Sequence, residues 1–157
     1  MRIVLDTNIL VSALLVGDGA GTAPRAVLRL CLDGRVTPLM GAALYAEHED
    51  VLGRDELFER SPLSPVERGA VFDALMSACV WTPIYYLWRP NLPDAGDDHL
   101  VELALAGGAA WIVTANVRDL ERGELRFDDL RIGTAGDFLD YYNAHEHHDD
   151  HEQETKR

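Results

Sequence analysis

The sequence of 157 residues predicts an α/β fold, in which helices pack around a central parallel sheet. Two observations support this prediction. Short apolar runs of strand character alternate with segments of helical period along the chain. The boundaries of these segments are rich in the residues that begin and end helices, such as threonine, serine, proline and glycine. Apolar residues make up 47% of the chain and there is no internal repeat, so we expect one ordered domain over residues 1–143.

The first half of the chain has well-marked element boundaries. An apolar run ends abruptly at Asp6, which is typical of a buried strand that leads into a helix. Thr22-Ala23-Pro24 places a capping residue and a proline at the start of another helix, because proline fits the first helical turn. The predicted elements are a strand at Arg2–Leu5, a helix to Leu15, a helix from Thr22 to about Gly34, a strand at Val36–Met40 and a helix at Gly41–Leu52.

The second half continues the alternation. Ser64 and Glu67 have the spacing of a capping box, which predicts the start of a helix. Beyond Ala144 the chain has no apolar residue, so we expect a polar, disordered tail over residues 144–157. The predicted elements are a helix from Ser64 to about Cys79, strands at Val80–Trp88, Trp111–Thr114 and Leu130–Ile132, and helices at His99–Ala106 and Thr134–Tyr142.

The composition excludes a membrane-spanning protein and disfavours an exported one. No run approaches the ~18–20 apolar residues that a membrane helix needs, and Asp6 interrupts the N-terminal apolar run too early for a signal peptide. Cys31 and Cys79 are the only cysteines, and their apolar surroundings fit neither a metal-binding pattern nor a disulfide framework. We therefore expect a cytoplasmic protein with two buried free thiols.

The net charge is −13, from 14 basic and 27 acidic residues. The last 13 residues contribute −3, so the rest of the chain has a charge of −10. Proteins that bind nucleic acid normally rely on lysine and arginine. This charge therefore opposes nucleic-acid binding unless cations or a partner offset it.

Several acidic residues stand where a parallel sheet places its ligands, beyond the carboxyl ends of the strands. Asp6 follows the first strand, Asn116 and Asp119 follow the strand at Trp111–Thr114, and Asp98 opens the helix that leads into that strand. Glu47 lies on the third helix. Mg²⁺ prefers such oxygen ligands, and a metal ion held there could activate water and stabilise phosphate charge. The pattern therefore suggests hydrolysis of a phosphodiester.

Each of these residues also has a purely structural interpretation. Asp6 and Asp98, with its neighbour Asp97, could serve as helix caps. Glu47 could be an exposed acid on its helix, and Asp119 could be an ordinary turn residue. From the residues alone, both interpretations stay open.

Four motifs together are similar to one known family. They are Ile3–Ser12 with its Asp-Thr-Asn turn, the acidic helix Ala46–Arg54, the segment Asp94–Ala104 and the segment Trp111–Leu120. In this order they resemble the PIN-domain family, in the branch of VapC-like ribonucleases that are toxins of type II toxin–antitoxin systems. The resemblance extends from Arg2 to about Tyr142.

The resemblance implies a three-layer α/β/α PIN-like fold with a central parallel sheet, and a Mg²⁺- or Mn²⁺-dependent endoribonuclease. It implies that Asp6 and Asp98 bind the metal, and that Glu47 binds the metal or its water. Asn8 and Thr114 would orient the acids by hydrogen bonds, as metal sites generally require.

The last ligand position departs from the commonest family pattern. Many PIN proteins have an acid where this chain has Asn116, and in this branch an acid often follows three residues later, here Asp119. Either residue could complete the metal site, and both are candidates.

The same resemblance implies three partners: RNA as substrate, a cognate antitoxin protein and a second copy in a homodimer. An antitoxin with basic or aromatic segments would suit the acidic cleft. Apolar helix faces at Leu14–Leu15 or Val27–Leu30 could form a dimer contact, although core packing explains them equally. The four histidines of the tail could chelate a transition metal or simply be solvated.

The sequence also has features of three other functions. A PIN-fold protein that binds RNA or a partner but cleaves poorly is favoured by the neutral Asn116. A phosphatase of the haloacid dehalogenase type also has Asp after its first strand, but it needs a second Asp where this chain has Asn8. A nucleotide-binding Rossmann domain would need a glycine-rich loop after the first strand, which this sequence lacks.

Overall fold

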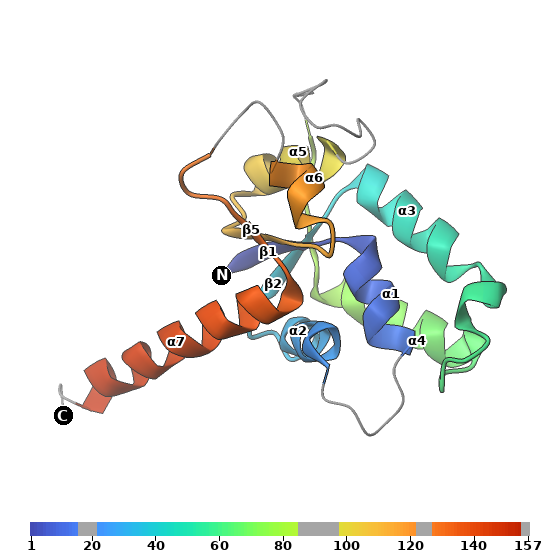
Figure 1. Cartoon of the computed structure of the whole chain (residues 1–157), viewed down its shortest axis with the longest axis horizontal. Coiled ribbons are helices and arrows are strands. Elements are labelled where there is room, and N and C mark those ends of the chain that lie inside the picture. The colour runs from blue at the N-terminus through green and yellow to red at the C-terminus, as the bar shows by residue number, and fades with distance from the viewer. Residues whose placement is uncertain (16–21, 85–97, 122–126, 155–157) are drawn as a thin grey trace.

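The computed structural model of the chain describes residues 1–15, 22–84, 98–121 and 127–154, with side chains up to Glu146 (Figure 1). Strands and helices alternate along it, as the sequence predicts. The elements are β1 (Arg2–Leu5), α1 (Thr7–Leu15), α2 (Ala23–Leu32), β2 (Thr37–Met40), α3 (Ala42–Leu52), the 3-10 helix η1 (Asp55–Phe58), α4 (Pro65–Ala78), β3 (Val80–Trp81), α5 (Asp98–Gly107), β4 (Trp111–Val113), α6 (Val117–Glu121), β5 (Arg131–Gly133) and α7 (Ala135–Glu154).

The strands of the described residues form one five-stranded sheet in the order β3-β2-β1-β4-β5. Every neighbouring pair is parallel. In the centre of the sheet, Ile3 pairs with Trp111 and Leu5 pairs with Val113. The carboxyl ends of β1 and β4 therefore lie side by side, and the residues that follow them share one edge of the sheet.

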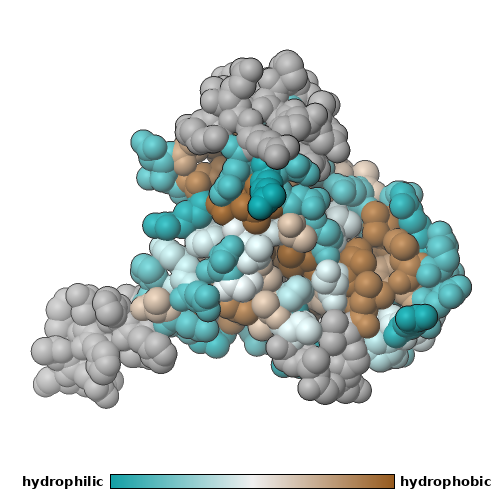
Figure 2. All heavy atoms as spheres, in the orientation of Figure 1, coloured by the Kyte–Doolittle hydropathy of each residue, from teal (hydrophilic) through white to brown (hydrophobic). Residues whose placement is uncertain are grey.

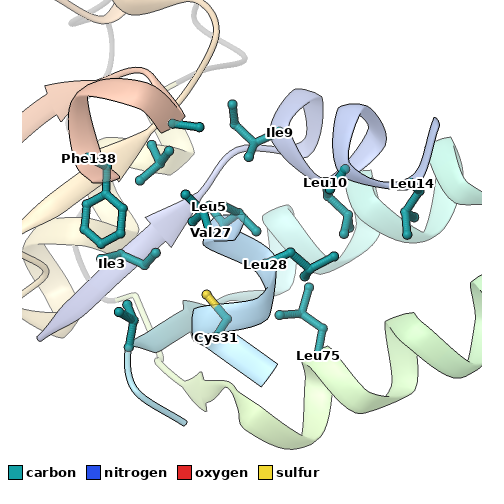
Figure 3. Close-up of a cluster of buried hydrophobic side chains, with 14 of the residues drawn as sticks. Ile3, Leu5, Ile9, Leu10, Leu14, Val27, Leu28, Cys31, Leu75 and Phe138 are labelled. Atoms are coloured by element: carbon teal, nitrogen blue, oxygen red, sulfur yellow. The ribbon is translucent and has the colours of Figure 1, made fainter. Parts of the chain in front are cut away.

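Side chains on the two faces of β1 enter two different cores, because neighbouring residues of a strand point to opposite faces. Ile3 and Leu5 belong to a core formed with α1, α2, α4 and α7. Figure 3 shows this core, where Val27 of α2 lies beside Leu5 of β1, and Leu28 of α2 points toward Leu10 and Leu75. Val4 belongs to a second core with α5 and part of α3. Helices thus cover both faces of the sheet, which confirms the predicted three-layer α/β/α fold.

The strand predicted at Val80–Trp88 is shorter in the structure. Only Val80 and Trp81 form β3, which pairs with the end of β2. The prediction was wrong for residues 82–84. β2 ends at Met40, where the chain turns into α3, so β3 has no neighbouring strand to pair with beyond Trp81. Residues 85–97, which include the aromatic end of the predicted strand and Asp97, lie outside the described residues.

The last helix is longer than the sequence predicts. α7 continues past Tyr142 to Glu154, whereas a disordered tail was expected from residue 144. No glycine or proline interrupts the chain after Gly136, and Glu146 accepts a hydrogen bond from Tyr142 and forms an ion pair with Arg35. Apolar spacing marks only the part of a helix that packs on a core, so it could not reveal this polar extension. None of the helices in the described segments, α7 included, is long and apolar enough to cross a membrane.

Both cysteines are free thiols, as predicted, but only Cys31 is buried as expected, whereas Cys79 is half-buried. Cys31 is fully buried, and burial raises its pKa to about 12, with a smaller contribution from Cys79 nearby. Burial likewise raises the pKa of Cys79 to about 12. Because the thiolate is the reactive form, both side chains behave as small apolar groups at neutral pH.

Gly107 at the end of α5 packs directly against β2. A Cβ atom on Gly107 would lie 2.3 Å from Cδ1 of Leu39, a side chain that is only 1% exposed and has no room to move away. We expect Gly107→Ala to lower the free energy of unfolding by about 1–3 kcal/mol, the usual cost of overpacking a core. Urea unfolding followed by circular dichroism measures this loss.

Gly69 in the middle of α4 is the matched control, because a Cβ there meets no atom within 4 Å. Since alanine is the better helix former, Gly69→Ala should raise the unfolding free energy by roughly 0.5–1 kcal/mol. Equal effects at the two glycines would contradict the close packing of α5 on β2.

Candidate functional site

Asp6 lies at the shared carboxyl edge of β1 and β4, where it is 6% exposed. Its backbone N–H donates to the carbonyl of Val113 at 3.0 Å, which continues the sheet pairing by one residue. Its carboxylate oxygen Oδ2 accepts hydrogen bonds from Thr114 Oγ1 at 2.7 Å and from Asn8 Nδ2 at 3.1 Å. Among the described residues, both bonds reach the same oxygen, so Oδ1 is left without a donor.

Thr114 and Asn8 are themselves held in place. Thr114 is fully buried, and its Oγ1 also accepts a hydrogen bond from the backbone N–H of Asn116 at 3.0 Å. Asn8 accepts from the backbone N–H of Ala115 at 3.1 Å. The residues after β1 and after β4 therefore form one hydrogen-bonded group that fixes the orientation of the Asp6 carboxylate.

Asp98 is the first residue of α5 and is fully buried. Its position in the first helical turn is favourable for a negative charge, because the unpaired N–H groups there carry partial positive charge. Glu102 stands one turn further along α5 and is 3% exposed. Residues four apart lie on the same face of a helix, so α5 buries two carboxyl groups on one side.

Glu47 lies in the middle of α3, and its side chain is 40% exposed. Its Oε2 is 3.0 Å from Nε2 of His99, the residue after Asp98. The structure therefore brings the acidic helix α3 to the start of α5, as a site made of Glu47 and Asp98 requires.

A second contact joins α3 to the residue after Asp6. Nδ1 of His48 lies 2.8 Å from Oγ1 of Thr7, and both side chains are buried. Burial, with a smaller effect from neighbouring His99, lowers the pKa of His48 to about 4. His48 is therefore neutral at physiological pH, and it links α3 to α1 without adding charge.

Asn116 and Asp119 are both exposed, in contrast to Asp6 and Asp98. The carbonyl of Asn116 accepts the first hydrogen bonds of the short helix α6, from the N–H groups of Asp119 and Leu120. Through its own N–H, Asn116 is connected to Thr114 and so to Asp6. Asp119 stands in the first turn of α6.

The oxygen donors at this edge fit Mg²⁺, which usually takes one or two carboxylates and keeps several water molecules. Asp6 Oδ1 and the second oxygen of Glu47 have no hydrogen-bond donor among the described residues. No three Asp, Glu, His or Cys side chains within the described residues already stand as a metal-holding group. The candidate ligands are thus spread over α3, α5 and the segments that follow β1 and β4, and a cation would have to join them.

The sequence matches the model of one known family. A family model described as the PIN domain matches residues 2–118, about three quarters of the chain. The chain belongs to the PIN domain family. The family predicted from the four motifs is thereby confirmed.

Solved structures agree with this fold. A chain in the crystal structure of VapBC2 from Rickettsia felis, bound to a DNA fragment from its promoter, superposes on this PIN domain with a TM-score of 0.54. The two are 16% identical, and the match covers 84% of this chain and 97% of the other. No curated protein matches the sequence.

Four buried polar residues of the site were not singled out from the sequence: Thr7, His48, His99 and Glu102. Three of them directly follow a candidate acid along the chain. His48 lies four residues from both Leu44 and Leu52, so the three share the buried side of α3. Nothing in the sequence indicated its partner, because Thr7 is 41 residues away.

Proposed function

We propose that this PIN-domain protein is a Mg²⁺-dependent endoribonuclease and the toxin of a toxin–antitoxin pair. The observation that supports it best is the Asp6 carboxylate, fixed through one oxygen by Thr114 and Asn8 with the other oxygen open. Membership of the PIN domain family supports the nuclease activity. The similarity to a chain of the VapBC2 complex supports the pairing with an antitoxin.

Each side chain has a distinct part in the proposed reaction. When bound, Mg²⁺ would lower the pKa of a water molecule and offset the charge of the phosphate. Asp6 and Asp98 would hold the ion, while Glu47 would bind it or hold its water. Thr114 and Asn8 would keep the Asp6 carboxylate in the orientation that binds the ion.

The negative charge of the protein affects RNA and an antitoxin in opposite ways. With a net charge of −13, the surface repels RNA, so the metal ion must lower the local negative charge before a phosphate can approach. A basic antitoxin segment, in contrast to RNA, would be attracted by the negative charge and bind the acidic edge tightly. We propose that the protein acts on RNA in the cytoplasm and is kept inactive there by its antitoxin.

A second copy of the chain is the other proposed partner. Of the apolar residues considered for a dimer contact, Leu14, Val27 and Leu28 are buried in the core. Leu15 at the end of α1 is 37% exposed and Leu57 in η1 is 43% exposed. Figure 2 shows hydrophobic residues on the side of the molecule where Figure 1 places α1 and α3. This side is our candidate for the homodimer contact.

Cleavage of labelled RNA by the purified protein tests the proposed function. Single-stranded RNA, double-stranded RNA and DNA of the same sequence are incubated with Mg²⁺, with EDTA, and with EDTA followed by excess Mg²⁺. We expect cleavage of RNA that EDTA abolishes and Mg²⁺ restores. Cleavage that persists in EDTA would refute the metal-dependent mechanism. Tight RNA binding without cleavage would favour the alternative, a PIN-fold binding protein with a weak site, for which the neutral Asn116 is the argument.

The ligand position after β4 allows a specific prediction. Asn116→Asp should strengthen Mn²⁺ binding by about tenfold, because a charged ligand replaces a neutral amide in the group connected to Asp6. Isothermal titration calorimetry measures this affinity. Asp119→Asn makes the opposite charge change on α6. Loss of Mn²⁺ binding in Asp119→Asn, together with an unchanged affinity in Asn116→Asp, would assign the position to Asp119 instead.

A further inference from the structure

We infer that His99 is a positioning residue that holds the Glu47 carboxylate in the orientation in which its second oxygen faces the metal or its water. The inference rests on the proposed function, since Glu47 needs an orientation only if it serves such a site. It adds to that function a residue that is not an acid.

The contact joins the buried imidazole of His99 to the half-exposed carboxylate of Glu47. His99 is 8% exposed in the second position of α5, and its Nε2 lies 3.0 Å from Oε2 of Glu47. The Glu47 side chain is 40% exposed on the outer part of α3 and could otherwise turn among several rotamers. The buried imidazole therefore restricts the carboxylate, rather than the reverse.

The hydrogen bond also determines the tautomer of His99. Its Nε2 must carry a proton to donate to the carboxylate, and Nδ1 is buried without a hydrogen-bond partner among the described residues. A proton on Nε2 leaves only a lone pair at Nδ1, whereas a proton on Nδ1 would bury an unpaired N–H. The tautomer that the surroundings favour is thus the one that holds Glu47.

The backbone of Glu47 is fixed from a different direction. The next residue, His48, bonds to Thr7 at the start of α1, beside Asp6. Helix α3 is therefore held relative to Asp6 through His48, and the Glu47 carboxylate is held relative to Asp98 through His99. With Oε2 taken by His99, Oε1 of Glu47 is the atom left for the metal or its water.

A contact that only stabilised the fold would behave differently. A hydrogen bond to a half-exposed carboxylate contributes little to folding, whereas loss of a group that orients a metal ligand typically weakens metal binding about 10–100-fold. The two roles are separable because Mn²⁺ affinity and thermal stability are measured independently. A double-mutant cycle with Glu47 then shows whether His99 acts through that carboxylate.

The experiment titrates Mn²⁺ into the full-length protein by calorimetry and records the melting temperature without metal. We expect His99→Leu to weaken Mn²⁺ binding at least about tenfold. His99→Gln should restore most of the affinity, because its amide can still donate to Glu47. In a Glu47→Gln background, His99→Leu should cause no further loss. His145→Leu, a change at an exposed histidine of α7, is the matched control and should bind Mn²⁺ as the wild type does.

Each other result is informative. Wild-type affinity in His99→Leu, or an equal loss in the Glu47→Gln background, would overturn the inference and leave the proposed function standing. If the wild type itself binds no Mn²⁺, the proposed function fails first and the inference with it. If His99→Leu does not fold, His99→Gln decides: retained affinity supports the positioning role, and a tenfold loss in a stably folded His99→Gln protein refutes it.

Discussion

Replacing Asp6 with asparagine is expected to lower Mg²⁺-dependent RNA cleavage by about a hundredfold or more. Loss of a residue that merely orients a ligand costs about 10–100-fold, and Asp6 is proposed as a ligand itself. Its open oxygen Oδ1 is the atom that would meet the cation. Asparagine has no charge, and its one side-chain oxygen would still accept the hydrogen bonds from Thr114 and Asn8. The NH₂ group then faces the place of the metal ion.

The fold should tolerate this change. Asparagine has the size of aspartate and can still accept from Thr114, so the hydrogen bonds that join the ends of β1 and β4 persist. We therefore expect the variant without metal to melt close to the wild-type temperature, so that lost activity reflects lost chemistry.

Asp140→Asn is the matched control for Asp6→Asn. Asp140 is exposed on α7, on an element that contributes no candidate ligand, and its substitution makes the same change in net charge. It should leave cleavage within about a factor of two of the wild type, as surface substitutions usually do. Cleavage at wild-type rate by Asp6→Asn would remove the central residue from the proposed site.

Lowering the pH from 7 to 4 is expected to reduce the free energy of unfolding by about 3 kcal/mol through His48 alone. Burial, and to a smaller extent His99, lowers the pKa of His48 to about 4 in the folded protein, against about 6.5 in an unfolded chain. Between these values the unfolded chain binds a proton that the folded protein excludes. The stabilising contribution is therefore complete above pH 6.5 and is lost as the pH falls toward 4.

Urea unfolding at several pH values measures this effect, with His48→Asn as the test variant. Asparagine retains a polar atom near the position of Nδ1, which contacts Thr7, but it does not titrate. The stability of the variant should depend less steeply on pH between 6.5 and 4 than that of the wild type. His145→Asn removes an exposed histidine and corrects for general effects of charge. Equal slopes in the wild type and His48→Asn would show that His48 titrates normally.

The sheet and the acids after its strands could be predicted from the sequence because both depend on local patterns. Strands buried on two faces are continuous apolar runs, and the residue at which such a run stops is visible in the sequence, as at Asp6. The polar end of α7 and the shortness of β3 were missed because neither leaves a local pattern in the sequence. An exposed helix has no apolar spacing, and the length of a strand depends on its partner.

The contacts of the two histidines could not be predicted because they join distant parts of the chain. The bond from Thr114 to Asp6, across 108 residues, was expected only from the family resemblance, whereas nothing indicated that His48 contacts Thr7 across 41 residues. The hydrogen bond between His99 and Glu47 likewise requires α3 and α5 to be placed next to each other. A motif identifies the kind of residue that a site needs, whereas the fold decides which side chain holds it.

The raised pKa values of the two thiols have a practical consequence for labelling this protein. With a pKa of about 12, each of Cys31 and Cys79 is ionised in only on the order of 10⁻⁵ of molecules at pH 7. Maleimide reagents consume thiolates, so the wild-type protein should remain unlabelled under mild conditions. A single cysteine introduced on the surface of α6 would then be modified selectively. Spin labels or fluorophores could report on metal and antitoxin binding without removal of the native cysteines.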